Sequence, residues 1–331
     1  MLEATRLIGS EWASGQEADS PPHPMIPRRQ FLQSFVVAAA APMIVRAAQR
    51  AEFRLRYVLS SALYGEMPLE VILPEVAKTG SEAIDLWCRP HGNQREQITE
   101  MGDAAFAALL GKHRVKLGVS TRYPLGPAGL GDEMKWLKKF GGGIIVTGSK
   151  GPSEPSGAAA RTAVREFLER MKPHVATAEE NGVTIAVENH GKQLLHHPDS
   201  LRYFAEFNRS AHLGIALAPH HLHAWVDQLP ALIRDLGARQ IPFMYFQEHS
   251  AGIFAKVAKE IELQQLPGFG GGLDYRPVIK ALADIRYTGL VEIFMHPTPR
   301  GIPILPTVAE ITAAINRSRD YIERCRREVV G

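Results

Sequence analysis

Residues 182–191 read GVTIAVENHG, and this stretch decides the fold. Its first part is a short apolar run, rich in β-branched residues, that is typical of a buried strand. The run ends abruptly in a carboxylate, an amide and an imidazole at Glu188, Asn189 and His190. In parallel α/β folds, ligands and chemistry gather at the carboxyl ends of the strands. The stretch therefore predicts a strand with a functional site at its end. The alternative is a carboxylate paired with a Lys or Arg at the rim.

Similar apolar runs recur along the chain and alternate with amphipathic stretches. We expect strands at Leu55–Leu59, Ala83–Trp87, Lys116–Ser120, Gly143–Thr147, Val183–Glu188, Leu213–Ala218, Pro242–Gln247 and Leu290–Phe294. We expect helices at Pro68–Lys78, Gln94–Lys112, Asp132–Phe140, Ala163–Asn181, Asp199–Phe207 and Tyr275–Ile285. Asp132 and Asp199 stand where helix N-caps are expected, and Gly182 where a helix ends in a left-handed residue. The pattern predicts an α/β protein with a single closed (β/α)₈ barrel of parallel strands over residues 51–331. An open doubly wound sheet is the alternative.

The first fifty residues do not share this alternation. Residues 1–24 are polar and proline-rich, and Arg28 and Arg29 then precede a short apolar run that ends near Ala47. This order is typical of a twin-arginine export leader. Met25, directly before the arginines, suggests that residues 1–24 come from an overlong gene start. We expect residues 1–50 to be a leader outside the fold and the barrel to be exported, for example to a periplasm. The alternative is a basic N-terminal helix that caps a cytoplasmic barrel.

Charge and composition limit the class of partner. The chain has 331 residues, a net charge of +3 and two cysteines, Cys88 and Cys325. So small and dispersed a charge argues against binding to nucleic acid or to an anionic membrane. No apolar run is long enough for an ordinary membrane span, and two cysteines do not form a disulfide framework. The expected partner is a small molecule, and self-association stays open.

Histidines gather where the expected strands end. Nine of the thirteen lie at or just after these ends: His91, His190, His196, His197, His220, His221, His223, His249 and His296. Strand alternation also predicts which carboxylates face the barrel interior. Glu188 shares a face with the small Ala186, and Glu292 would lie one layer below His296. A buried carboxylate must be paired, protonated or bound to metal, so Glu292 is a candidate site residue. The alternative for Glu292 is an ion pair with an interior Lys or Arg.

Four segments resemble the xylose-isomerase-like barrels, a family of sugar isomerases, sugar epimerases and related endonucleases. They are VENHG at 187–191, APHH at 218–221, LPGFGGGLDYRPVIKAL at 266–282 and YTGLVEIFMHP at 287–297, within a resemblance that covers residues 53–320. In this family a Glu, an Asp, a His and a Glu hold a divalent metal that orients the sugar oxygens and stabilises an enediolate. The resemblance therefore implies a small-molecule sugar, neutral or oxidised, as the substrate.

Three of the four ligand positions of the family are changed. Glu188 matches the first ligand, but Ala218, Gln247 and Phe294 stand at the other three. His221 matches a His that often follows the Asp-Pro turn of the family. One expectation is a rearranged metal site built from Glu188, His221, Gln247, His249 and Glu292, with Mn²⁺, Zn²⁺ or Fe²⁺ favoured over Mg²⁺. The other is acid/base chemistry by Glu188 and the histidines without a metal.

The residues and the resemblance together predict an exported enzyme that moves a proton next to a sugar carbonyl. We expect Glu188, His249 and Glu292 to be its catalytic residues. Trp87 would stack on the sugar or pack in the core, and the sugar hydroxyls would bind His91, Lys150, Asn189, His190 and His296. Residues 268–272 would form an active-site loop. The alternatives are a metal-free keto-sugar lyase and a non-catalytic sugar-binding barrel. An endonuclease would need a basic groove and an intact multi-metal site, which the charge and the changed ligands argue against.

Overall fold

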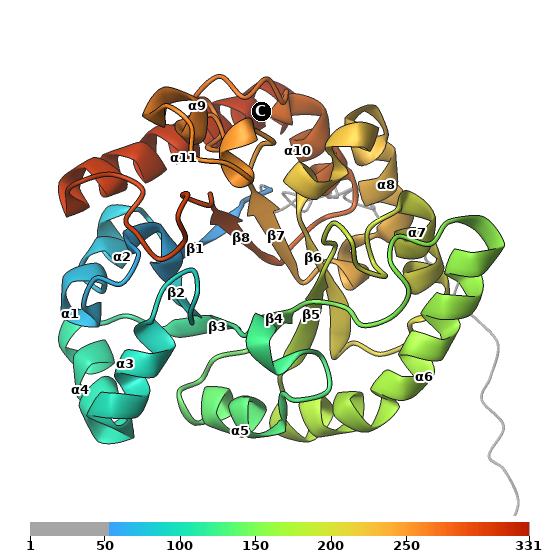
Figure 1. Cartoon of the computed structure of the whole chain (residues 1–331), viewed down its shortest axis with the longest axis horizontal. Coiled ribbons are helices and arrows are strands. Elements are labelled where there is room, and N and C mark those ends of the chain that lie inside the picture. Colours follow the sequence, from blue (N-terminus) through green and yellow to red (C-terminus); the bar gives the residue numbers. More distant parts are fainter. Residues whose placement is uncertain (1–52, 331) are drawn as a thin grey trace, which may run out of the picture. The chain divides into compact units, whose positions relative to one another are not determined.

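The computed structural model describes residues 53–330, so the expectations for the leader lie outside the described residues. Eight parallel strands form a closed barrel in sequence order, with β8 paired to β1 (Figure 1). The strands are β1 (Arg56–Ser60), β2 (Ala83–Trp87), β3 (Leu117–Thr121), β4 (Ile144–Thr147), β5 (Thr184–Glu188), β6 (Leu213–Leu217), β7 (Phe243–Phe246) and β8 (Leu290–Ile293). The prediction of a single (β/α)₈ barrel is confirmed, and each strand lies within a residue or two of its expected bounds.

Helices surround the barrel on all sides (Figure 1). They are α1 (Leu69–Ile72), α2 (Glu75–Lys78), α3 (Gln94–Met101), α4 (Asp103–His113), α5 (Gly131–Lys139), α6 (Gly157–Asn181), α7 (Pro198–Phe207), α8 (Leu229–Leu236), α9 (Lys259–Leu263), α10 (Tyr275–Asp284) and α11 (Val308–Val330). Two expected helices are each divided in two. Pro74 separates α1 from α2, because proline lacks an amide hydrogen and restricts the residue before it. Gly102, at φ 82°, separates α3 from α4. None of the helices between residues 53 and 330 is long and apolar enough to cross a membrane.

The helix ends correct two of the expected caps. Asp132 lies in the first turn of α5, whose N-cap is Leu130. The N-cap of α7 is His197, whose ring accepts a hydrogen bond from the amide of Asp199. The Asp199 carboxylate instead accepts the amide of Gly157 and so joins α7 to the start of α6. The third expectation is confirmed, because Gly182 ends α6 in the left-handed region at φ 65°.

Large aromatic side chains fill the barrel interior below its carboxyl end. The rings of Trp87 and Phe294 stack with centroids 4.6 Å apart, and Tyr245 packs against both. All three side chains are almost fully buried. They form a solid floor, so any ligand must bind above them, where β2, β5 and β8 end.

Candidate functional site

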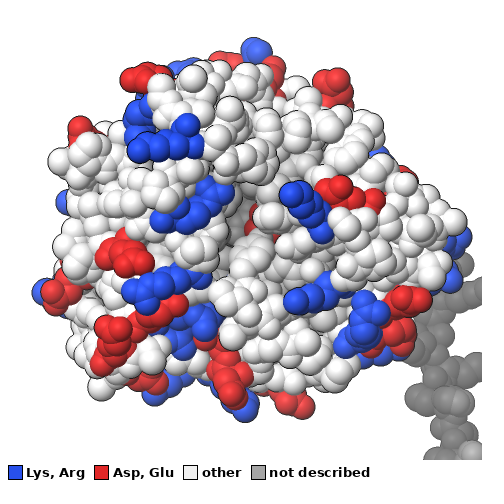
Figure 2. Space-filling model, in the orientation of Figure 1, with Lys and Arg blue, Asp and Glu red and all other residues white. Residues whose placement is uncertain are grey.

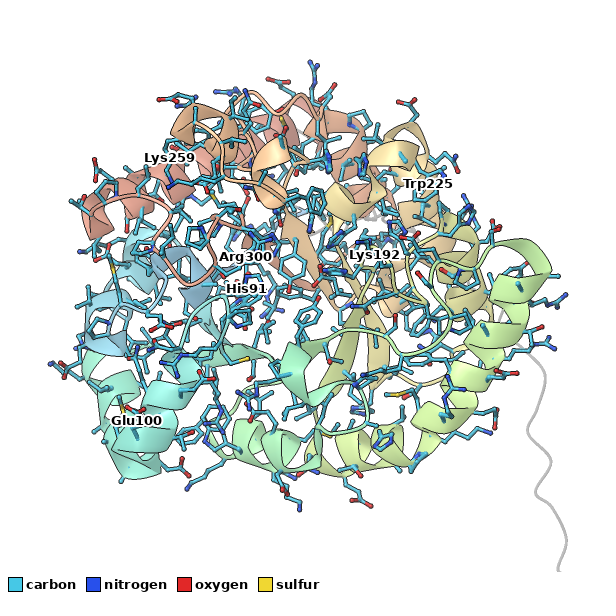
Figure 3. The ribbon with its side chains drawn as sticks, viewed as in Figure 1. His91, Glu100, Lys192, Trp225, Lys259 and Arg300 are labelled. Carbon is cyan, nitrogen blue, oxygen red and sulfur yellow. The ribbon has the colours of Figure 1, made fainter. Side chains whose placement is uncertain are left out.

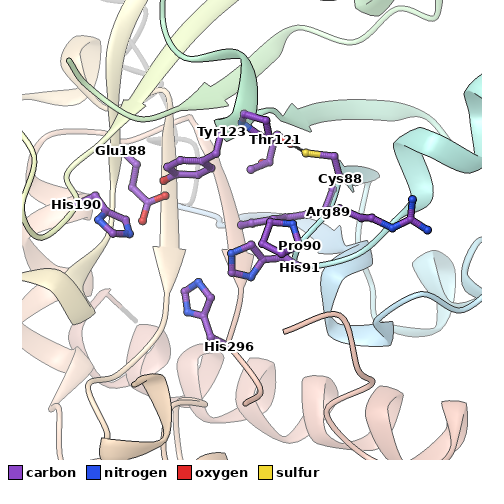
Figure 4. A pocket seen from close by; sticks show the side chains of 11 residues that line it. Cys88, Arg89, Pro90, His91, Thr121, Tyr123, Glu188, His190 and His296 are labelled. Carbon is purple, nitrogen blue, oxygen red and sulfur yellow. Dashed lines mark hydrogen bonds between the residues drawn. The ribbon is translucent and has the colours of Figure 1, made fainter. Parts of the chain in front are cut away.

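A pocket with a cavity volume of about 150 Å³ lies at the carboxyl ends of the strands (Figure 4). Segments that follow β2, β3, β5 and β8 supply its walls. The lining residues are Trp87, Cys88, Arg89, Pro90, His91, Thr121, Tyr123, Pro124, Glu188, His190 and His296. Glu188 and His190 stand on one side and His91 and His296 on another, with Thr121 and Tyr123 between them (Figure 4). The pocket thus collects five of the predicted site residues: Trp87, His91, Glu188, His190 and His296.

One carboxylate and two imidazoles beside the pocket have the spacing of a metal site. Glu188 ends β5, while His220 and His221 open the 3₁₀ segment Pro219–Gln228 after β6. Each residue offers a ligand atom within 4.8 Å of the other two, and all three are buried. Nε2 of His221 lies 3.4 Å from Oε1 of Glu188. Neither ring nitrogen of His220 has a hydrogen-bond partner among the described residues.

A buried amide fixes this histidine pair. Oδ1 of Asn189 accepts the Ala218 amide at 2.6 Å, and its Nδ2 donates to the Ala218 carbonyl at 3.0 Å. Asn189 thereby ties the end of β5 to the end of β6, immediately before His220. The structure places Asn189 as a brace between the strands, and it does not line the pocket.

Burial favours the neutral forms of the Glu188 carboxyl and of the imidazoles in the site. It raises the pKa of the Glu188 carboxyl to about 7, against a smaller opposing effect of His190. It lowers the pKa of His221 to about 3, helped by the neighbouring histidines. The pKa of His91 falls to about 3 for the same main reason. Neutral imidazoles are the form that binds metal or accepts a proton, so the cluster suits both kinds of chemistry.

Gln247 takes part in the site through His296. Its side-chain amide donates to Nδ1 of His296 at 3.0 Å and to Oε1 of Gln265 at 2.8 Å. A ring nitrogen that accepts leaves the proton of a neutral imidazole on the other nitrogen. His296 therefore presents its Nε2–H as a hydrogen-bond donor. Gln247 therefore acts on the pocket through His296 and is not itself among the residues that line it.

Three further predicted site residues are not members of the Glu188 grouping, although His249 borders it through a hydrogen bond to the His220 backbone. The ring of His249 stacks on that of His223, with centroids 3.7 Å apart. Lys150 is exposed and does not line the pocket. Glu292 is fully buried, as strand alternation predicts. It lies on β8, shortly before the aromatic floor residue Phe294 in the sequence. Neither His249 nor Glu292 shares the grouping of Glu188 with His220 and His221.

The neighbour of Glu292 is a second carboxyl group, that of Asp85 on β2. Both side chains are fully buried, and each alters the pKa of the other. No ion pair joins either of them to a basic side chain within residues 53–330. The interior ion pair that was the alternative for Glu292 is therefore absent from the described part of the chain.

Four important residues were not predicted as site residues. The sequence argument named His221 as a candidate ligand but not its neighbour His220. Strand alternation does not extend into the 3₁₀ turn that brings both rings to Glu188. Asp85 carried a usable signal, since it shares a strand face with Trp87 and is a carboxylate within an apolar run. Thr121 and Tyr123 line the pocket from the end of β3, and nothing in their local sequence separates them from ordinary strand and loop residues.

The glycine-rich loop at residues 268–272 does not line this pocket. It borders a separate cavity of about 510 Å³ together with Glu248 and α11. A Cβ at Gly271 would stand 2.3 Å from the backbone carbonyl oxygen of Gln264, so the loop needs glycine to pass this backbone. The expectation of an active-site loop is therefore wrong for the pocket that contains Glu188.

Basic side chains surround the hollow at the centre of the barrel face (Figure 2). Elsewhere on this face, acidic and basic side chains are mixed. Arg300 lies next to His91 over the middle of the barrel, and Lys192 lies on the opposite side (Figure 3). The Arg300 guanidinium donates to the carbonyls of Pro297 and Ile253, each at 2.8 Å, and so joins the loops after β8 and β7. Its charge contributes to the low pKa of His91.

The fold and pocket define a (β/α)₈ barrel of the kind that carries its chemistry at the carboxyl ends of the strands. The chain belongs to the xylose isomerase-like TIM barrel family, whose profile matches residues 73–323. No curated protein matches the sequence.

Solved structures share the fold at low sequence identity. The zinc-bound IolI protein has a TM-score of 0.63 and 15% identity, over 83% of this chain and 99% of its own. An L-ribulose 3-epimerase has a TM-score of 0.62 and 15% identity, over 83% and 97%. The D-psicose 3-epimerase from Clostridium cellulolyticum H10, solved with D-tagatose, has a TM-score of 0.61 and 14% identity, over 82% and 99%. Zinc and sugar ligands thus occur within this fold.

Proposed function

We propose that the chain is a sugar isomerase or epimerase that uses a divalent metal to move a proton next to a sugar carbonyl. The observation that carries this proposal is the grouping of Glu188, His220 and His221 beside the pocket. Similar barrels in the structural comparison include sugar 3-epimerases and a zinc-bound protein, which supports the same kind of chemistry.

The donor set fits a metal ion. His220 has two buried ring nitrogens without a partner in residues 53–330, and a buried polar group normally has one. Glu188, His220 and His221 would hold the ion, and two imidazoles with one carboxylate suit Zn²⁺, Mn²⁺ or Fe²⁺ better than Mg²⁺. A bound ion would supply Lewis-acid polarisation of the substrate oxygens. Ala218 and Phe294 have no donor atoms, so the four-ligand arrangement of the family is not available here.

Glu188 is the proposed base. Its Oε1 faces His221, which leaves Oε2 to accept a proton from the carbon next to the carbonyl. His190 bonds the Gly191 carbonyl through Nδ1 at 2.8 Å, so Nε2 is its free acceptor. His296 presents Nε2–H, as Gln247 dictates. One donor and one acceptor on opposite walls suit a sugar that carries several hydroxyls, and the face of Trp87 suits its ring or chain.

Metal-free acid/base chemistry is the second candidate, and it points to elimination from an oxidised (keto) sugar. The observation that favours it is the pKa of Glu188, which burial brings to about 7. A base with this pKa is matched to neutral pH without help from a metal. Binding of sugar without turnover is the outcome that would reject both catalytic proposals.

We also propose export of the barrel by the twin-arginine route, on the sequence of residues 25–47 alone. Expression of the full chain, followed by fractionation and mass determination of the secreted product, tests this proposal. Replacement of Arg28 and Arg29 by Lys should retain the protein in the cytoplasm.

The experiment for the main proposal is turnover by the metal-loaded protein. Protein reconstituted separately with Zn²⁺, Mn²⁺ and Fe²⁺ would be incubated with D-psicose, D-tagatose, D-fructose and L-ribulose. Proton movement next to the carbonyl exchanges the carbon-bound hydrogen for deuterium in D₂O, which NMR detects without knowledge of the product. Exchange that needs both metal and Glu188 supports the proposal, whereas the same exchange in a metal-free sample favours the second candidate.

A further inference from the structure

We propose that the substrate is an anionic sugar, a ketose that carries a carboxylate, and that Arg300 binds this carboxylate at the mouth of the pocket. The assignment rests on the proposed function and names the substrate class of the same site. It concerns the part of the sugar that lies away from Glu188, the proposed base.

Arg300 is placed to meet a ligand in the pocket. It follows β8 and lies next to His91 over the middle of the barrel (Figure 3). His91 and His296 line the pocket on a different side from Glu188 (Figure 4). Burial lowers the pKa of each of these two histidines, and the positive charge of Arg300 lowers both further. The charge of Arg300 therefore acts on the wall of the pocket.

The guanidinium of Arg300 keeps free hydrogen-bond donors. An arginine has five N–H donors, and here two of them bond the carbonyls of Pro297 and Ile253. The other three have no partner among residues 53–330. A guanidinium matches the geometry of a carboxylate, to which it can donate two parallel hydrogen bonds. The two carbonyls hold the side chain in place before a ligand arrives.

The charge of Arg300 has no counterion in the described part of the chain. No acidic side chain within residues 53–330 forms an ion pair with it. Glu262, the acidic group whose charge acts on it, pairs with Lys259 and accepts the Thr298 amide at 2.8 Å. Burial lowers the pKa of Arg300 because its charge is partly removed from water. A partly buried charge without a partner is costly, and an anionic ligand would remove this cost.

Two other arginines near the pocket differ from Arg300 in this respect. Arg89 lines the pocket but pairs with Glu66 at 3.2 Å. Arg122, at the end of β3, pairs with Glu133 at 3.7 Å. Each of these arginines is thus held by an acidic side chain of the protein, whereas Arg300 can offer its charge to a ligand.

His296 supplies a second donor on the same side of the pocket. The hydrogen bond from Gln247 to its Nδ1 leaves its Nε2–H free to donate to an anion. Glu188 is the one acidic residue that lines the pocket, and it stands on another side (Figure 4). Repulsion between a bound carboxylate and the protein is therefore small near Arg300.

A single guanidinium favours a carboxylate over a phosphate. A carboxylate carries one negative charge, which Arg300 balances. A phosphate monoester carries about −1.5 to −2 at neutral pH, so part of its charge would stay uncompensated in a partly buried place. The favoured substrate is therefore a sugar acid, and the corresponding neutral ketose would bind without the contribution of Arg300.

Three ketoses that differ at C6 provide the test: D-tagatose with a hydroxyl, D-tagaturonate with a carboxylate and D-tagatose 6-phosphate with a phosphate. Calorimetry would measure the binding of each to the full chain, with and without metal. NMR in D₂O would measure deuterium exchange next to the carbonyl in the metal-loaded protein. We expect the wild type to bind D-tagaturonate about 30-fold or more tightly than D-tagatose, as a desolvated charged hydrogen bond would provide.

Variants at Arg300 separate charge from loop packing. Arg300→Gln should weaken the binding of D-tagaturonate by about 30-fold or more and Arg300→Lys, which keeps the charge, by less. Loss of the bonds between the loops would affect D-tagatose equally, so the ratio of the two affinities isolates the charge. Lys112→Gln removes one positive charge at an exposed position in the last turn of α4, near the start of β3, and is the control.

The outcomes separate the anion site from the proposed function. Equal wild-type affinity for D-tagatose and D-tagaturonate, or an equal loss of both in Arg300→Gln, would overturn the inference, and exchange of either sugar would still support the proposed function. Tightest binding of the 6-phosphate would overturn the assignment to a carboxylate. Binding of D-tagaturonate through Arg300 without exchange in any of the three sugars would reject the proposed function and support the anion site.

Discussion

Nε2 of His221 and Oε1 of Glu188 lie 3.4 Å apart at the point where β5 and β6 end. Both side chains are buried, and within residues 53–330 neither forms an ion pair with any other residue. This contact joins a residue of the VENHG segment to a residue of the APHH segment. The two residues are two of the three ligands of the proposed metal site.

Replacement of Glu188 by Gln should abolish activity without unfolding the protein. The amide keeps the size of the side chain but cannot take a proton, and loss of a general base lowers rates by about 10²–10⁴-fold. Deuterium exchange measures the activity, and circular dichroism measures the fold. Glu100→Gln, at an exposed position in α3, is the matched control. A folded Glu188→Gln variant with wild-type turnover would sink the assignment of the site.

The aromatic floor should contribute strongly to stability. Phe294 is 1% exposed and stacks on Trp87 with centroids 4.6 Å apart. Its replacement by Ala leaves a cavity, so we expect the free energy of unfolding to fall by about 3–5 kcal/mol. Phe254 is 74% exposed, and Phe254→Ala should change it by no more than about 0.5 kcal/mol. Urea denaturation of both variants checks the contrast, and equal effects would contradict it.

The buried Asp85 should make the metal-free protein less stable as the pH rises. Burial raises its pKa from 3.8 to about 7, so the folded state binds its proton more tightly than the unfolded chain does. Its contribution to stability is therefore complete below about pH 4 and is lost as the pH rises through about 7. The slope is at most about 1.4 kcal/mol per pH unit for one proton.

Asp85→Asn isolates the contribution of the Asp85–Glu292 pair, because the carboxylates outside this pair titrate equally in both proteins. The wild-type free energy of unfolding minus that of the variant should decrease between pH 4 and pH 7. A difference that stays constant over this range would show that Asp85 has an ordinary pKa in the folded protein.

The sequence predicts the fold well and the site in part, for physical reasons. Period-two patterning and the length of the apolar runs locate all eight strands. The alternation of side chains along a strand correctly places Glu188 and Glu292 inside the barrel. This alternation does not extend into the turn after β6, where non-helical backbone at Leu222 and Trp225 interrupts the 3₁₀ segment. The approach of side chains from strands that do not pair, such as Asp85 on β2 and Glu292 on β8, depends on barrel closure across β1 and leaves no local signal.

The metal ligands give the sharpest contrast between the sequence prediction and the geometry. The sequence suggested His249, whereas His220 has two unpartnered ring nitrogens and lies with Glu188 and His221. We expect His220→Ala to weaken metal binding by at least about 100-fold, because it removes a ligand outright, where loss of an outer-shell partner already costs about 10–100-fold. His249→Ala should leave the affinity within a few-fold of the wild type.

Elemental analysis after dialysis against graded chelator measures both variants beside the wild type. Near-stoichiometric metal in the wild type and His249→Ala, with loss in His220→Ala, would establish the site at Glu188, His220 and His221. Loss in His249→Ala alone would mean that its ring leaves His223 to join the ion, as the sequence suggested. An absence of metal from all three proteins would move the assignment to acid/base chemistry without a metal, for which the neutral imidazoles and the raised pKa of Glu188 are already suited.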